Sequence, residues 1–129
     1  MSDEMKRDAR ILLVDDEPNI LTALSFLLNR EGHWVHTAQS GEEAWEKLQA
    51  LTPDIVVLDV MMPGMNGYEL AEKIRKEPRF EATHIIFLTA KGAAADKMSG
   101  YDAGGEYYLV KPFENQDFVA IIQELAAYG

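Results

Sequence analysis

The 129-residue sequence contains no cysteine. Without thiols the chain has no disulfide framework, no cysteine-ligated zinc site and no catalytic cysteine, a composition compatible with a reducing cytosol. No apolar run is long enough to span a membrane, and the first seven residues carry too many charges for a signal peptide. We therefore expect a soluble cytoplasmic protein with no membrane partner.

Basic residues are also scarce. Twelve lysines and arginines stand against 22 aspartates and glutamates, which gives a formal net charge of −10. Phosphate contacts need clustered cations, and here the cations are scattered among acids, so direct nucleic-acid binding is not expected.

Short apolar runs alternate with helical patterns along the chain, which is typical of βαβ units around a parallel sheet. Some runs, such as 55–58, are apolar on both faces, as strands covered by helices on both sides would be. With 47% hydrophobic residues, we expect one domain over 1–129 with a core at about 10–127. The expected strands are 10–14, 34–38, 54–58, 84–88 and 107–110.

Five helices are expected between and after these strands. Pro18 suits the first turn of a helix, Gly32 suits a stop, and Ser40 with Glu43 three residues later predicts a capping box. Segment 92–101 has a weak apolar face and an internal glycine, so a marginally stable helix and an ordinary surface helix both remain open. The two tryptophans, Trp34 and Trp45, are expected to be packing residues.

Three of the expected strands end on charged residues. Asp15 and Asp16 follow the first strand, Asp59 the third and Lys111 the fifth, while Thr89 follows the fourth. In a doubly wound sheet, ligands bind beyond the carboxyl ends of the strands. These five residues are therefore expected to form one site, away from the three histidines.

This set of residues favours phosphoryl chemistry on a carboxylate. Two carboxylates about 4 Å apart repel by roughly 4 kcal/mol at an effective dielectric near 20, so three must protonate, separate or bind a cation. Oxygen-only ligands favour Mg²⁺, with Mn²⁺ as the alternative. Asp59 stands alone on the central strand and is the best nucleophile, and Lys111 and Thr89 would meet charge on the phosphoryl oxygens.

The sequence resembles the receiver domains of two-component response regulators over almost its full length. The matching segments are 11–18 (ILLVDDEP), 54–67 (DIVVLDVMMPGMNG), 88–91 (LTAK) and 102–113 (DAGGEYYLVKPF), in the family's order. The resemblance implies a flavodoxin-like α/β fold, with strand order 2-1-3-4-5 and five helices on two faces.

It also implies roles for named residues. Asp59 would accept a phosphoryl group from a phosphohistidine of a sensor histidine kinase or a histidine phosphotransfer protein. Mg²⁺ would be held by Asp15 or Asp16, Asp59 and the backbone carbonyl of Met61.

Further roles follow from the same resemblance. Thr89 would move toward the phosphoryl group and Tyr108 would swing inward, which changes the face around them and the last two helices. Lys111 would pair with the phosphate, and its bond to Pro112 would be cis. Because side chains alternate along a strand, Tyr107 and Tyr108 are expected on opposite faces.

The resemblance therefore implies a signalling switch that regulates an unknown downstream protein or output domain and catalyses only its own phosphorylation and dephosphorylation. Monomer and phosphorylation-dependent dimer both remain open; segment 114–125 lacks the arginine typical of one family dimer mode. No output segment follows in this sequence, so a stand-alone receiver and a receiver from a larger protein are both open. By the same resemblance, Met61 and Lys91 occupy positions that in this family influence hydrolysis of the acyl phosphate, and Met61 is expected to lengthen the lifetime of the phosphorylated form.

Three rival functions are weaker. A haloacid-dehalogenase-type phosphatase or phosphotransferase needs a second aspartate two residues after the nucleophile, where this chain has Met61. A flavodoxin-like flavin binder needs a phosphate loop after the first strand, where Asp15-Asp16-Glu17 would repel the phosphate. A non-phosphorylatable receiver would have lost the acidic pair, the acceptor aspartate or the lysine, and all are present.

Overall fold

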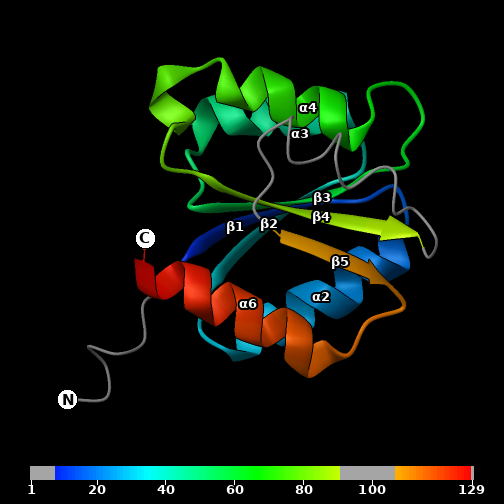
Figure 1. The fold of residues 1–129 in the computed structure, drawn as a ribbon, viewed down its shortest axis with the longest axis vertical. Helices are drawn as coiled ribbons and strands as arrows, with labels where there is room; N and C mark the ends of the chain where they lie inside the picture. Colours follow the sequence, from blue (N-terminus) through cyan, green and yellow to red (C-terminus); the bar gives the residue numbers. More distant parts are fainter. Residues whose placement is uncertain (1–7, 91–106, 129) are drawn as a thin grey trace.

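The computed structural model of the chain describes residues 8–90 and 107–128. A parallel sheet forms the middle layer, with helices α3 and α4 on one face and α2 and α6 on the other (Figure 1). The elements in chain order are β1 (Arg10–Val14), α2 (Pro18–Arg30), β2 (Trp34–Ala38), α3 (Gly41–Ala50), β3 (Ile55–Asp59), α4 (Gly67–Arg75), the 3₁₀ helix η1 (Pro78–Phe80), β4 (His84–Ala90), β5 (Tyr107–Lys111) and α6 (Asn115–Tyr128).

The five strands are parallel in the order β2-β1-β3-β4-β5, so the predicted order is confirmed. The order reverses at β1, which pairs with β2 on one side and β3 on the other. Val14 of β1 is paired with Leu58 of β3, and Asp59 is paired with Leu88 of β4. This register brings the residues that follow β1 next to the end of β3, which is where ligands bind in such sheets.

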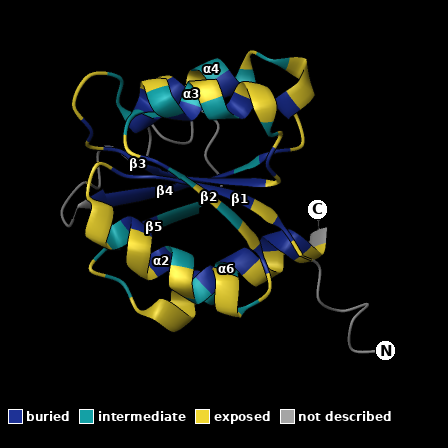
Figure 2. Ribbon diagram, turned by 180° about the vertical axis from the view of Figure 1, so that it is seen from behind, coloured by how far each residue is buried: buried dark blue, intermediate teal, exposed yellow. Residues whose placement is uncertain are grey.

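Alternate residues of each central strand supply two separate cores. Leu12 and Val56 point to the core under α3 and α4, while Ile11 and Val57 point to the core under α2 and α6. All four are at most 1% exposed, and Figure 2 shows the central strands buried between the two helical layers. Burial on both faces explains why these runs are apolar without alternation.

The helix signals in the sequence mostly hold. Pro18 is the first residue of α2. Gly32, in the turn between α2 and β2, has φ +96°, a conformation that favours glycine. The Ser40 hydroxyl accepts the backbone N–H of Glu43, but the Glu43 carboxylate accepts from Gln39 and not from Ser40, so the predicted capping box is not reciprocal.

A complete capping box opens α4 instead. The Asn66 side chain accepts the backbone N–H of Glu69, and the Glu69 carboxylate accepts the backbone N–H of Asn66, each at 2.9 Å. This box satisfies two of the donors left free at the start of a helix and fixes the entry of α4 directly after the loop that follows β3.

Some boundaries and packing roles differ from the expectation. Strands β3, β4 and β5 run on to Asp59, Ala90 and Lys111, so the expected site residues of these strands lie within the sheet. The packing role expected for Trp34 is wrong: it begins β2, the outermost strand on one side of the sheet, and is 65% exposed.

The fifth expected helix, 92–101, lies outside the described residues, within which α2, α3, α4 and α6 are the α-helices. Among the helices of 8–90 and 107–128, none has the length and apolar character needed to cross a bilayer.

Candidate functional site

The predicted acidic cluster forms at the carboxyl end of the sheet. Asp15 follows β1 and is 1% exposed, and Asp59 ends β3 and is 5% exposed. Asp16 is more exposed than these two. One carboxylate oxygen from each of the three lies within 4.8 Å of the others, so the expected meeting of these carboxylates is observed.

Lys111, at the end of β5, provides the positive charge of this cluster. Its Nζ donates to Asp15 Oδ2 at 3.0 Å and lies 3.6 Å from Asp59 Oδ1. It also lies 3.8 Å from Glu17 Oε1, an exposed carboxylate that the sequence analysis did not assign to the site. The peptide bond from Lys111 to Pro112 is cis, the geometry that the resemblance implied.

Backbone groups also hold the two buried aspartates. The backbone N–H of Glu17 donates to Asp15 Oδ1 at 2.9 Å, and the backbone N–H of Met61 donates to Asp59 Oδ1 at 3.3 Å. The second oxygen of Asp59 is thereby left to contact a ligand, while the second oxygen of Asp15 accepts from Lys111.

Burial disfavours the charged form of Asp59. It raises the pKa of Asp59 to about 6, with the charge of Asp15 acting in the same direction and Lys111 opposing it. Burial alone would lower the pKa of Lys111, but its hydrogen bond to Asp15 and the nearby Asp59 and Glu17 charges raise it above its usual value. Lys111 therefore offsets only part of the negative charge of the three aspartates.

Gly67, the first residue of α4, packs against the backbone of the site. A Cβ at this position would lie 2.6 Å from the Asp59 carbonyl oxygen and 3.1 Å from Val60 Cα. The Gly67 N–H donates to the Val60 carbonyl at 3.2 Å. Only glycine permits this approach, so Gly67 sets the distance between α4 and the Asp59 backbone.

The remaining expected residues surround the same edge. Thr89 lies on β4, 1% exposed, one residue beyond the partner of Asp59. Tyr107 packs on the core under α2 and α6 and Tyr108 on the core under α3 and α4, which confirms that they face opposite ways. Met61 is 69% exposed in the loop after β3.

The donor set fits a hard divalent cation. Three carboxylates converge without cysteine or histidine, and two of them are almost fully buried; within residues 8–90 and 107–128, Lys111 is the cation that pairs with both. Oxygen ligands of this kind suit Mg²⁺ or Mn²⁺. Asp15, Asp16 and Asp59 are the side chains that would hold it.

Residues 11–123 match the family model described as the response regulator receiver domain. The chain belongs to this family. Such a receiver is a regulatory module of a two-component system, and response regulators act with histidine kinases and output domains.

Individual relatives agree with this assignment. The receiver is 37% identical to response regulator Rre1 of Synechocystis over 124 residues, which cover 95% of this chain and 54% of Rre1. A putative response regulator of Chloroflexus aurantiacus has a TM-score of 0.88 and 36% identity, covering 94% of this chain and 99% of that one.

A third relative was solved with a metal ion. The receiver domain of the Pseudomonas aeruginosa sensor histidine kinase PA1611, solved with a magnesium ion coordinated in its active-site cleft, has a TM-score of 0.83 and 28% identity, covering 92% of this receiver and 98% of that chain. This receiver spans about half the length of the curated relatives it matches.

Proposed function

We propose that this receiver is a phosphoaccepting switch in which Asp59 takes a phosphoryl group from the phosphohistidine of a sensor histidine kinase or a histidine phosphotransfer protein. The observation that carries the proposal is the burial of Asp59 beside Asp15 and within 3.6 Å of the Lys111 ammonium. A carboxylate in this setting is a nucleophile with a cation beside it.

In the transfer step, an oxygen of Asp59 attacks the phosphorus as the bond from phosphorus to the donor imidazole nitrogen breaks. The electron pair of that bond returns to the imidazole nitrogen, and the product is an acyl phosphate. Lys111 would pair with a phosphoryl oxygen in place of Asp59, and the Thr89 hydroxyl would donate to another.

Mg²⁺, when bound by Asp15, Asp16, Asp59 and the Met61 carbonyl, would supply the positive charge that offsets these carboxylates and the phosphoryl oxygens. Asp15 keeps Lys111 oriented toward Asp59 through its 3.0 Å contact. Met61, whose backbone N–H donates to Asp59, has an exposed side chain, and we propose that this side chain shields the acyl phosphate from water.

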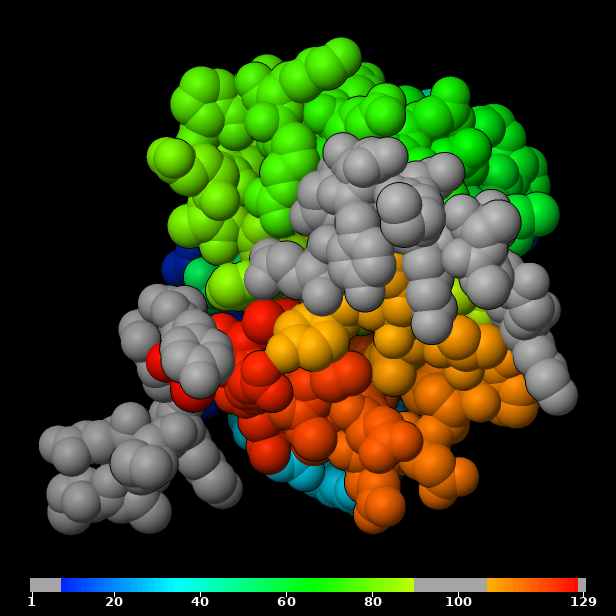
Figure 3. Space-filling view, in the orientation of Figure 1, coloured from blue at the N-terminus to red at the C-terminus, as the bar shows by residue number. Residues whose placement is uncertain are grey.

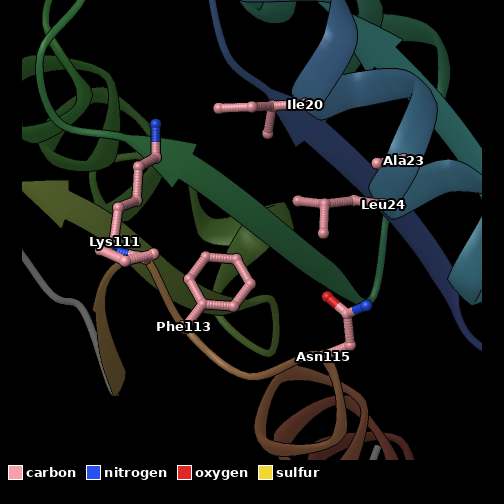
Figure 4. A pocket seen from close by; sticks show the side chains of 7 residues that line it. Ile20, Ala23, Leu24, Lys111, Phe113 and Asn115 are labelled. Carbon is pink, nitrogen blue, oxygen red and sulfur yellow. The ribbon is translucent and has the colours of Figure 1, made fainter.

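An apolar cavity beside Lys111 is a suitable place for the phosphodonor to dock. It has a volume of about 480 Å³ and lies between the first half of α2 and the segment after β5. Ile20, Leu24 and Phe113 point toward one another across it, and Lys111 borders it (Figure 4). A helix that carries a phosphohistidine would bury apolar residues here while the imidazole reaches Asp59.

We propose that the phosphorylation signal is transmitted through the face around Thr89 and Tyr108. Figure 3 shows β5 and α6 together on one face, with α4 above them. Phosphorylation would change this face to regulate a downstream protein or output domain, as a monomer or as a dimer. The domain would cover 1–129, act in the cytoplasm and catalyse only its own phosphorylation and dephosphorylation.

Intact mass spectrometry after incubation with acetyl phosphate tests the proposal. One phosphoryl adduct is expected on the native protein in Mg²⁺, and none in EDTA or on the Asp59→Asn variant. Asp54→Asn, which changes an aspartate at the other end of β3, is the matched control and is expected to retain the adduct. Absence of the adduct on the native protein, or its presence on Asp59→Asn, would contradict the proposal.

A further inference from the structure

Three aromatic rings connect helix α4 to strands β4 and β5. The ring of Tyr68 meets Phe87 edge-on with centroids 4.9 Å apart, and the ring of Tyr108 lies 5.4 Å from Phe87 on the neighbouring strand. The Tyr108 hydroxyl donates to the Tyr68 hydroxyl at 3.2 Å. Phe87 is 0% exposed, so the two tyrosines meet above a fixed ring.

Tyr68 is also next to the backbone of the proposed phosphoacceptor. It follows Gly67, whose Cα packs against the Asp59 carbonyl and whose N–H donates to the Val60 carbonyl. Tyr68 lines a cavity of about 530 Å³ together with residues of the loop after β3, including Met61. A shift of the Asp59 and Val60 backbone therefore moves the start of α4, and Tyr68 with it.

We infer that Tyr68 is a positioning residue for Tyr108: its hydroxyl holds Tyr108 over Phe87 in the unphosphorylated protein, and Gly67 relays backbone movement at Asp59 to this contact. The holding role stands on the structure, and the relay rests on the proposed function. The relay runs through α4 and does not pass through Thr89. At 3.2 Å the bond is longer than the usual ~2.7–2.8 Å for two hydroxyls, which suits a contact that must break.

Ring packing alone would also place Tyr108 over Phe87, so the test must remove the hydroxyl and keep the ring. Tyr68→Phe does this. Tyr107→Phe is the matched control, because Tyr107 is the adjacent residue on β5, faces the other core, and donates its hydroxyl to Glu124 of α6.

The side-chain rotamer of Tyr108 is measured by NMR on ¹³C-tyrosine-labelled, unphosphorylated protein, with its signals assigned from a Tyr108→Phe spectrum. Tyr68→Phe is expected to lower the ratio of the resting rotamer to the others about 2- to 10-fold, the range for loss of one neutral hydrogen bond. Tyr107→Phe should leave the ratio unchanged. An unchanged ratio in Tyr68→Phe, or an equal change in Tyr107→Phe, would overturn the inference.

The relay is tested with beryllofluoride and Mg²⁺, a mimic of an acyl phosphate, in a Thr89→Ala background. The Tyr108 signals are expected to shift in Thr89→Ala and to stay in place in Thr89→Ala/Tyr68→Phe. Loss of the shift in Thr89→Ala alone, or its persistence in the double variant, would overturn the relay. A ¹⁹F spectrum without a bound complex on the native protein would instead contradict the proposed function, and the rotamer measurement would stand.

Discussion

Polar residues have different roles at the two ends of the parallel strands, here called the amino edge, where the strands begin, and the carboxyl edge, where they end. At the amino edge, Asp54 accepts the backbone N–H of Arg10 at 2.9 Å, and the buried Thr83 hydroxyl donates to the Pro53 carbonyl at 2.9 Å. At the carboxyl edge, Asp15 and Asp59 are buried close together. Asp54 and Thr83 complete backbone hydrogen bonds, while Asp15 and Asp59, which also accept backbone N–H groups, repel each other.

The difference separates folding from function. Groups that satisfy the backbone stabilise the native state, whereas buried like charges lower its stability until a ligand balances them. Local choices that conflict with stability are expected at functional sites. Changes at the carboxyl edge should therefore alter phosphorylation as well as stability, and changes at the amino edge should alter stability alone.

The largest effect is expected from Gly67→Ala. The new Cβ would lie 2.6 Å from the Asp59 carbonyl, which belongs to a buried strand that cannot move freely, so unfolding free energy should fall by about 3 kcal/mol and phosphorylation should be lost. Urea unfolding and mass spectrometry after acetyl phosphate measure the two effects.

Gly41→Ala is the matched control for Gly67→Ala, because Gly41 is the first residue of α3. Its Cβ would lie 2.9 Å from Met65 Cβ and 3.0 Å from the Met65 carbonyl oxygen, in the loop after β3 and not against Asp59. A smaller loss of stability with phosphorylation retained is expected. Equal effects of the two substitutions on phosphorylation would show that the close approach at Asp59 has no special role.

Mg²⁺ is expected to give the next largest effect. Because an ion that binds only the folded state stabilises it by mass action, a concentration 100 times the dissociation constant should add about 2.7 kcal/mol to the unfolding free energy. Thermal unfolding at pH 7.5, with Mg²⁺ or with EDTA, measures it.

The two edges should respond differently to this metal. Asp59→Asn is expected to lose most of the Mg²⁺ effect, and Asp54→Asn to retain it. If Asp54→Asn lost the Mg²⁺ stabilisation as well, this stabilisation would not come from binding at the carboxyl edge.

Without metal, Asp59→Asn should raise stability. The folded protein holds a proton on Asp59 up to its pKa of about 6, while the unfolded chain releases it near 4, so the native protein loses stability as pH rises from about 4 to 6 and keeps that deficit above 6. Replacing the charge should recover about 1–2 kcal/mol at pH 7.5, after allowance for solvent screening, and the gain should shrink toward pH 4.

Urea unfolding in EDTA from pH 4 to 8 tests this dependence. Asp54→Asn, which keeps an acceptor oxygen for the Arg10 N–H, should give no such gain. A gain for Asp59→Asn that does not change with pH would mean that charge at Asp59 is not its cause.

The same contrast explains what the sequence could reveal. Strands buried on both faces are continuous apolar runs, and Asp15, Asp59 and Lys111 stand where those runs end, so the sheet and the charged cluster were predictable. The contact between Lys111 and Glu17, and the close approach of Gly67 to Asp59, depend on how loops and helices pack in three dimensions. The sequence around a glycine does not show whether glycine is needed for a close approach between two backbone segments or for ordinary turn geometry.

Trp34 illustrates the same limit from the other direction. A large aromatic residue at a strand end favours burial, but β2 became an edge strand only through the strand order, which its own residues do not encode. The alternation of apolar runs with helical patterns agrees with the order 2-1-3-4-5 but does not determine it, and the order was expected from the family resemblance.

The smallest effect is expected at the amino edge, where Thr52 has φ 106°, a conformation that is strained for a β-branched residue. Thr52→Gly should relieve the strain and raise the unfolding free energy by about 1 kcal/mol, or the melting temperature by about 4 °C. Thr52→Ala keeps a Cβ and should gain much less. Thr52 precedes β3 and Asp59 ends it, so the two residues lie at opposite edges of the sheet. The rate of phosphorylation by acetyl phosphate should therefore not change in Thr52→Gly. A changed rate would mean that the two edges are coupled through β3.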